Sequence, residues 1–152
     1  MNSIRYALLL VATLGTTALL AQSNPRLEGL WTGVITDSTG TEHKFELLIE
    51  LGKGGRLTGK TYYHEFNGDV VEQEFRGKIH WDKSMTLYDE AFLNPDEIRT
   101  ADTQPRAYQL LFARSAFGDS LDGFWQAHNG KVLDALRKQF GKVRLQKRVT
   151  GV

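Results

Sequence analysis

The chain has 152 residues, with 19 lysines and arginines against 18 aspartates and glutamates, and it contains no cysteine. This near balance of charge excludes an electrostatic argument for binding nucleic acid or an anionic membrane surface. The lack of cysteine excludes thiol catalysis and a disulfide framework, so the fold must depend on packing and hydrogen bonding.

The first 21 residues are organised as a secretory signal peptide. Arg5 is the single charge of the n-region, no acidic residue precedes Glu28, and residues 7–20 form an apolar run with the length of an h-region. The run is short for a transmembrane helix, which needs ~20 apolar residues, although a retained membrane anchor is the alternative. We expect cleavage after Ala21, or after Ala18, and a periplasmic or secreted protein with no membrane span in the mature chain.

Residues 22–152 have the size of one domain. Short apolar–polar alternations separated by glycine-containing turns predict an antiparallel β-meander. A polar stretch with two prolines, residues 94–105, is predicted to be a long loop. The predicted strands are residues 29–37, 42–51, 56–66, 71–81, 84–93, 106–117, 121–128 and 142–149.

The fourth predicted strand has the clearest alternation. Its apolar positions share one parity, while charged residues and His80 take the other parity, so one face is expected to be buried and the other wet. The apolar positions are Val71, Phe75, Ile79 and Trp81.

One segment departs from this alternation and predicts a short helix before the last strand. Residues 131–140 place apolar side chains along one stripe, and Gly141 is a plausible end for the helix. The stripe consists of Val132, Leu133, Leu136 and Phe140.

About eight consecutive strands with short connections favour an all-β fold, a single antiparallel up-and-down barrel. Closing the sheet removes both edges, whereas a sandwich, the alternative, usually needs longer crossovers. The interior of an eight-stranded barrel has room for side chains or for one small ligand.

The first strand begins with Gly29-Leu30-Trp31, a Gly-x-Trp motif. This start resembles that of the calycin group, which comprises lipocalins, fatty-acid-binding proteins and avidins, so we describe the chain as lipocalin-like. The resemblance implies that Trp31 closes one end of the barrel and that a basic residue of the last strand, Arg144 or Arg148, lies across its ring. Alternatively, Trp31 is an ordinary core aromatic residue.

Parity also predicts which side chains line the interior. Residues on the apolar parity that carry a polar atom, together with neighbouring aromatic residues, have the mixed character of a small-molecule pocket. The alternative is a filled core in which the polar atoms bond to one another. The predicted ligand-binding set is Tyr63, Gln73, Phe75, Tyr108, Phe112 and Trp125.

No catalytic or metal-binding pattern is present in the sequence. The four histidines are on separate predicted strands without metal-ligand spacing, so we expect no metal, no cofactor and no enzymatic activity. Asp89 and Glu90 are adjacent in a strand and must face opposite sides, so at most one points inward, where it could anchor a ligand cation or pair with Arg114. A cross-strand hydrolase or isomerase site using His64, Asp89 or Glu90 is the enzymatic alternative.

The sequence therefore predicts an exported barrel that binds a small, largely apolar ligand in its lumen. The alternative is a solid barrel that docks onto an envelope protein through the long loop or through outward apolar residues. Such residues include Leu48, Tyr62 and Phe124.

Overall fold

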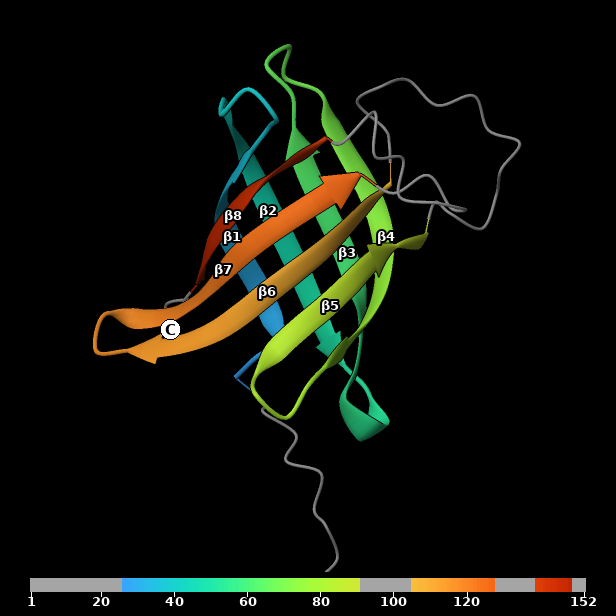
Figure 1. The fold of residues 1–152 in the computed structure, drawn as a ribbon, viewed down its shortest axis with the longest axis vertical. Helices are drawn as coiled ribbons and strands as arrows, with labels where there is room; N and C mark the ends of the chain where they lie inside the picture. The colour runs from blue at the N-terminus through green and yellow to red at the C-terminus, as the bar shows by residue number, and fades with distance from the viewer. Residues whose placement is uncertain (1–25, 91–104, 128–138, 149–152) are drawn as a thin grey trace, which may run out of the picture.

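The computed structural model describes residues 26–90, 105–127 and 139–148. These residues form eight strands that close into one antiparallel barrel in chain order (Figure 1). A 3-10 turn, η1 (Lys53–Gly55), lies between the second and third strands. The strands are β1 (Gly29–Thr36), β2 (Glu42–Leu51), β3 (Arg56–His64), β4 (Val70–Ile79), β5 (Ser84–Asp89), β6 (Arg106–Ser115), β7 (Gly118–Ala127) and β8 (Phe140–Lys147).

The barrel closes because β1 pairs with both β2 and β8. Trp31, for example, is opposite Leu47 on one side and Lys147 on the other. Each strand therefore has two neighbours, and the described sheet leaves no free edge for another chain. The predicted all-β up-and-down barrel is confirmed, and the sandwich alternative is wrong.

Alternation along the strands fills the barrel interior with side chains. Residues of one parity point inward and are buried, as on β2, where His43, Phe45, Leu47 and Ile49 alternate with more exposed residues. The interior is therefore a packed core over much of its length. Its fully buried large side chains include Trp31, Tyr108, Phe45, Phe75, Ile35, Leu57, Met85 and Leu110.

The alternation in β4 predicts that Trp81 continues the buried face of this strand, and this prediction is wrong. β4 ends at Ile79, and Trp81 lies in the following turn with 97% of its surface exposed. The hydrogen bond from His80 N to Ser84 O (2.8 Å) starts this turn, and Lys83 completes it with a positive φ of 68°. Because residue 81 lies in the turn where the chain reverses, alternation no longer determines where its side chain points.

Several other strand boundaries also differ from the predictions, as the starts of β7 and β8 illustrate. β7 begins at Gly118, within a predicted turn, because the reversal occurs at residues 116–117. β8 begins at Phe140, where the helix was expected to end, because Ala127 N already donates to Gln139 O (2.8 Å) across the two strands. The remainder of that predicted helix, most of the long loop and the signal peptide lie outside the described residues.

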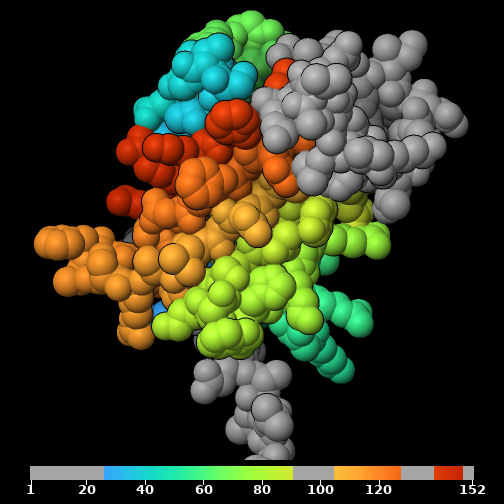
Figure 2. Space-filling view, viewed as in Figure 1, coloured from blue at the N-terminus to red at the C-terminus, as the bar shows by residue number. Residues whose placement is uncertain are grey.

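The hairpin of β6 and β7 extends away from the body of the barrel (Figure 2). A groove of about 960 Å³ lies beside this hairpin on the outer surface. Its lining includes Thr32 of β1, Asp122 of β7 and Arg144 of β8. Within the described ranges, no helix has the length and apolar character needed to cross a membrane.

Candidate ligand site

Polar and aromatic side chains replace the aliphatic core at one end of the barrel. We call it the Asp89 end; it is formed by the turns at residues 37–41 and 65–69, by the end of β5 and by the start of β6. The opposite end, the Trp31 end, contains the start of β1 and the end of β8. The inward-facing residues at the Asp89 end are His43, Thr61, Tyr63, Gln73, Asp89, Arg106, Tyr108 and Trp125.

Asp89 is the buried acid of this cluster, with 1% of its surface exposed. Its Oδ2 accepts hydrogen bonds from Arg106 N (2.8 Å) and from Tyr108 Oη (3.3 Å), whereas its Oδ1 has no hydrogen-bond partner among the residues that the structure describes. Burial raises the pKa of Asp89 to about 7, against the opposing effects of the Arg106 N–H and the Arg106 charge. The carboxyl group therefore titrates close to neutral pH and not in the usual acidic range.

Arg106 crosses the interior at this end. Its guanidinium carbon lies 4.5 Å from the centre of the Tyr63 ring and 5.0 Å from that of Trp125. Tyr63 is on β3 and Trp125 on β7, and these strands are on opposite sides of the eight-stranded ring. The side chain of Arg106, 7% exposed, therefore fills the space between two opposing walls.

Tyr108 is two residues after Arg106 on β6, so both side chains are on the inward face of the strand. Its ring stacks on Phe45, with 5.8 Å between ring centres, and its hydroxyl donates to Asp89. Burial and the charge of Asp89 raise the pKa of Tyr108 well above its usual value, so the phenol stays protonated and acts as a hydrogen-bond donor.

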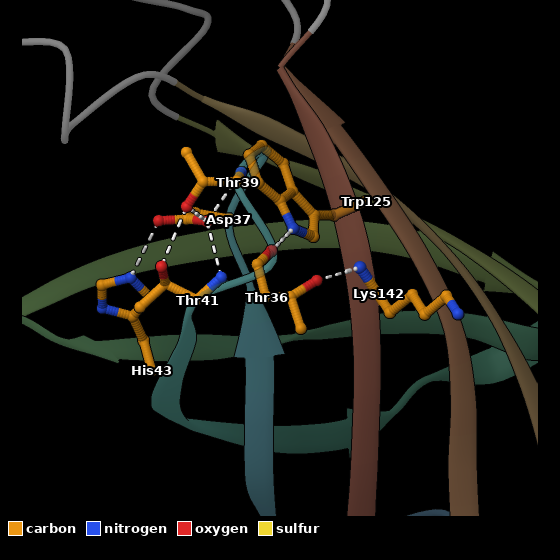
Figure 3. Close-up of polar contacts among 7 residues, drawn as sticks. All are labelled: Thr36, Asp37, Thr39, Thr41, His43, Trp125 and Lys142. Carbon is orange, nitrogen blue, oxygen red and sulfur yellow. Dashed lines mark hydrogen bonds and ion pairs between the residues drawn. The ribbon is translucent and has the colours of Figure 1, made fainter.

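Trp125 is held across the neighbouring strand by a backbone contact (Figure 3). Its indole Nε1 donates to Thr36 O (2.6 Å) at the end of β1. The indole passes over Gly141 of β8, where an added Cβ would lie 2.5 Å from Nε1 and 1.9 Å from Thr36 O. A glycine at position 141 is therefore required for this arrangement.

The turn after β1 contacts the same end of the barrel, because its Asp37 lies beside His43 (Figure 3). Asp37 accepts hydrogen bonds from Thr39 Oγ1 (2.7 Å), Thr39 N (2.8 Å) and Thr41 N (2.9 Å). These bonds, led by that from the Thr39 hydroxyl, lower the pKa of Asp37 to about 2. The His43 ring packs against Tyr63 and Phe66, its Nε2 lies 3.5 Å from Asp37 Oδ2, and its buried Nδ1 has no hydrogen-bond partner.

Five of the six predicted ligand-binding residues come together at the Asp89 end. Tyr63, Gln73, Tyr108 and Trp125 belong to the cluster, and Phe75 is the register partner of Asp89. Phe112 does not join them, because it lies four residues beyond Tyr108 on β6 and contacts the Trp31 ring edge-on, with 6.1 Å between ring centres. Their role toward a ligand stays a prediction.

The basic residue over Trp31 is Lys147, so the prediction of Arg144 or Arg148 is wrong. Lys147 Nζ lies 5.6 Å from the centre of the fully buried Trp31 ring. Arg144 has the outward parity of β8 and pairs with Glu42, and Arg148 is exposed beyond the strand end. Gly29 adopts a φ of 117°, which favours glycine, and an added Cβ would be in ordinary contact with the Lys147 side chain at 3.6 Å.

Sequence reasoning missed Arg106, Thr61 and Lys147. A parity rule that counted charged residues would have found Arg106, which shares the inward parity of Tyr108, and Lys147, which shares that of Leu145. Charged residues are rarely buried, so apolar parity alone does not indicate them. Thr61 shares the parity of Tyr63, but a short hydroxyl side chain gives no aromatic or apolar signal.

The groups proposed for an enzymatic site do not converge. Glu90 pairs with Arg76, and His64 Nε2 lies 3.4 Å from Glu46, so Asp89 alone of the three belongs to the buried interior. Arg114 is exposed and is not the partner of Asp89. No cluster of three or more histidine, aspartate or glutamate side chains able to hold a metal occurs in the part of the chain that the structure describes.

No family model matches this chain, and no curated protein matches its sequence. Its structure is similar to that of a redesigned β-barrel, mFAP1, bound to DFHBI, with a TM-score of 0.53 and 12% identity, covering 80% of this chain and 94% of that one. Apo shwanavidin gives a TM-score of 0.52 at 14% identity, covering 81% and 98%. A low-affinity mutant of shwanavidin gives 0.52 at 12% identity, covering 76% and 92%.

At these identities the similarity is one of fold. The chain has the fold of a calycin-type small β-barrel, which confirms the architecture that the Gly-x-Trp motif implied.

Proposed function

We propose that this protein binds a small, largely apolar ligand inside the Asp89 end of the barrel and that it catalyses no reaction. The observation that carries this proposal is Asp89 Oδ1, a buried oxygen with no hydrogen-bond partner in the described part of the chain. Leaving such a group unsatisfied costs ~1–3 kcal/mol, and buried polar atoms in native proteins are nearly always paired. A bound ligand that supplies the missing partner explains why the group is retained.

The surroundings of Asp89 support a binding role. Aromatic rings of Tyr63, Tyr108 and Trp125 provide apolar surface beside a few placed polar groups, which is the usual composition of a small-molecule site. Arg106 now fills the space between two of these rings. A long flexible side chain can shift toward solvent at lower cost than a packed ring, so this space can be opened to a ligand.

The chemistry of the cluster favours binding over catalysis. A general acid–base mechanism needs a group that exchanges protons with a positioned partner near the operating pH. Asp89 titrates near neutrality, but the groups that contact its carboxylate are a backbone N–H and the Tyr108 phenol, which keeps its proton. The similar barrel mFAP1, bound to DFHBI, is a further argument for a ligand-binding role of this fold.

Native mass spectrometry of protein purified from its own host tests the proposal. We expect one retained small molecule per chain in the wild type and its loss in Asp89→Asn. Asp122→Asn is the matched control, because Asp122 is an exposed acid of β7 that bonds to Ser120. A wild-type mass equal to that of the bare chain, with no thermal stabilisation by any compound of a small-molecule library, would overturn the proposal.

We also propose that the mature chain is exported, on the strength of the signal-peptide pattern in residues 1–21. The same mass measurement tests this. A chain starting at Gln22 or Leu19 is the expected result, and a native protein that keeps Met1 contradicts it.

A second candidate function is docking onto another envelope protein. Tyr88, Phe124 and Phe140 are exposed on the outer face of β5, β7 and β8, where they line a groove of about 430 Å³. Phe124→Gln with Phe140→Gln should abolish cross-linking to such a partner while the retained small molecule is unaffected. Trp81→Gln is the control, since Trp81 is exposed at the opposite end of the barrel.

A further inference from the structure

We propose that the ligand carries an anionic group, a carboxylate or a similar oxyanion, and that Arg106 binds it inside the Asp89 end. This inference rests on the proposed function and names the ligand class of that same site. It follows from the charges and hydrogen-bonding groups that surround the guanidinium.

Arg106 is a buried cation without a close counter-ion. Among the described residues, no carboxylate oxygen lies within 4 Å of its guanidinium nitrogens. Buried charges in proteins are usually paired, because removing a charge from water is costly. The rings of Tyr63 and Trp125 attract the cation through their faces, and the Tyr108 hydroxyl is a neutral hydrogen-bond partner for its N–H groups, but none of these contacts supplies a negative charge.

Asp89 is not a close counter-ion of the guanidinium, although the charge of Arg106 acts on its pKa. Its Oδ2 is engaged by the backbone N–H of Arg106 and by the Tyr108 hydroxyl, and neither oxygen reaches ion-pair distance of the guanidinium. Burial also raises the pKa of Asp89 to about 7, so its negative charge is only partly present at neutral pH. The described residues inside the Asp89 end therefore leave the positive charge of Arg106 incompletely balanced.

The other described residues that face this site add no acidic group that could offset the positive charge of Arg106. Among the residues classed as buried in the described chain, Asp89 is the single acid. The groups contributed by the surrounding elements are His43 of β2, Thr61 and Tyr63 of β3, Gln73 of β4, Asp89 of β5, Tyr108 of β6 and Trp125 of β7.

The geometry also indicates the shape of the ligand. A planar guanidinium presents paired N–H groups that match the two oxygens of a carboxylate, and such bidentate bonds are among the stronger ones in proteins. The rings of Tyr63 and Trp125 flank this position. A small aromatic carboxylate satisfies both features, with its anion at Arg106 and its ring against the aromatic wall.

Two probes that differ in charge test this inference: naphthalene-1-carboxylate and naphthalene-1-methanol. Isothermal titration at neutral pH compares them on the full mature protein. We expect the wild type to bind the carboxylate about tenfold or more tightly than the alcohol. In Arg106→Met the preference should disappear through loss of carboxylate affinity, and in Arg106→Lys part of it should remain.

Arg144→Met is the matched control, because it removes an arginine that pairs with Glu42 on the outer face of β8. It should keep the wild-type preference. Near-ultraviolet circular dichroism checks that each variant is folded, and if Arg106→Met does not fold, Arg106→Lys and the probe comparison on the wild type decide the question.

Equal binding of the two probes by the wild type would overturn the anionic ligand class while leaving the proposed small-ligand site in place. Retention of the carboxylate preference in Arg106→Met would overturn the assignment to Arg106. Failure of the wild type to bind either probe would count against both the inference and the proposed function.

Discussion

Lys147 lies over the ring of Trp31, with its ammonium nitrogen 5.6 Å from the ring centre. The two residues are register partners on β8 and β1, the pair of strands that closes the barrel. The ammonium also donates to Arg26 O, and the Trp31 indole donates to Leu27 O (2.8 Å), so the segment before β1 is tied to the same contact. This contact covers one end of the core.

Replacing Lys147 by methionine should therefore destabilise the barrel by about 0.5–1 kcal/mol, since it removes the cation–π contact while keeping an apolar stem. Urea unfolding followed by tryptophan fluorescence measures the change. Arg144→Met, which removes an exposed ion pair, should cost less. A larger loss for Arg144→Met than for Lys147→Met would contradict this account.

The buried carboxyl group of Asp89 should make stability depend on pH near neutrality. Its pKa is about 7 in the folded protein against 3.8 ordinarily, so between these values the folded state holds a proton that the unfolded state has released. The free energy of unfolding must then fall as pH rises through this window, by about 4 kcal/mol at most. Asp89→Asn should lose this slope, whereas Asp122→Asn should keep it.

Urea titrations at steps between about pH 4 and about pH 8 measure the slope. Asp37 does not interfere, because its pKa is lowered to about 2 and its contribution is lost only as pH falls below its ordinary value of 3.8. Parallel profiles for the wild type and Asp89→Asn would show that Asp89 titrates normally.

Gly141→Ala should destabilise the protein by about 3 kcal/mol. The new Cβ would lie 1.9 Å from Thr36 O, a backbone atom, so β1 and β8 must separate and the Trp125–Thr36 hydrogen bond must weaken. Gly52→Ala is the control, since its nearest neighbours are at 3.5 Å and its effect should be below about 1 kcal/mol. Equal stability of the two variants, measured by thermal and urea unfolding, would argue against close packing of Trp125 over β8.

Trp81→Gln should change stability by less than about 0.5 kcal/mol, because the side chain is almost fully exposed. Trp81 should also account for the fluorescence that acrylamide quenches in the native protein, since Trp31 and Trp125 are buried. The substitution should thus shift the emission to shorter wavelength and reduce quenching. A large loss of stability would mean that residue 81 packs into the core, as its parity predicted.

The alternation of apolar and polar residues was a reliable guide inside strands and failed at their ends. β2 begins at Glu42 and ends at Leu51, as predicted, because ten residues in a row keep one face apolar. At Trp81 the same rule predicted a buried side chain, but the side chain is exposed, because a turn that starts at His80 reverses the chain. Period-2 alternation carries information only while the backbone remains extended.

The sequence by itself determined the class of fold. Strand length, glycine-containing turns and one apolar face per strand are local properties, and closing the sheet is the solution that pairs every edge. The same parity selected Tyr63, Gln73, Tyr108 and Trp125, four residues that the barrel brings to one end.

Only the tertiary structure decided which charged residues enter the interior. Arg106 lies between Tyr63 of β3 and Trp125 of β7, and Lys147 lies over Trp31 of β1. Each of these contacts joins residues far apart in the chain, and the register between strands sets them. Burying a charge is unfavourable locally, so it becomes acceptable only where the closed barrel supplies aromatic faces and hydrogen-bond partners from several strands at once.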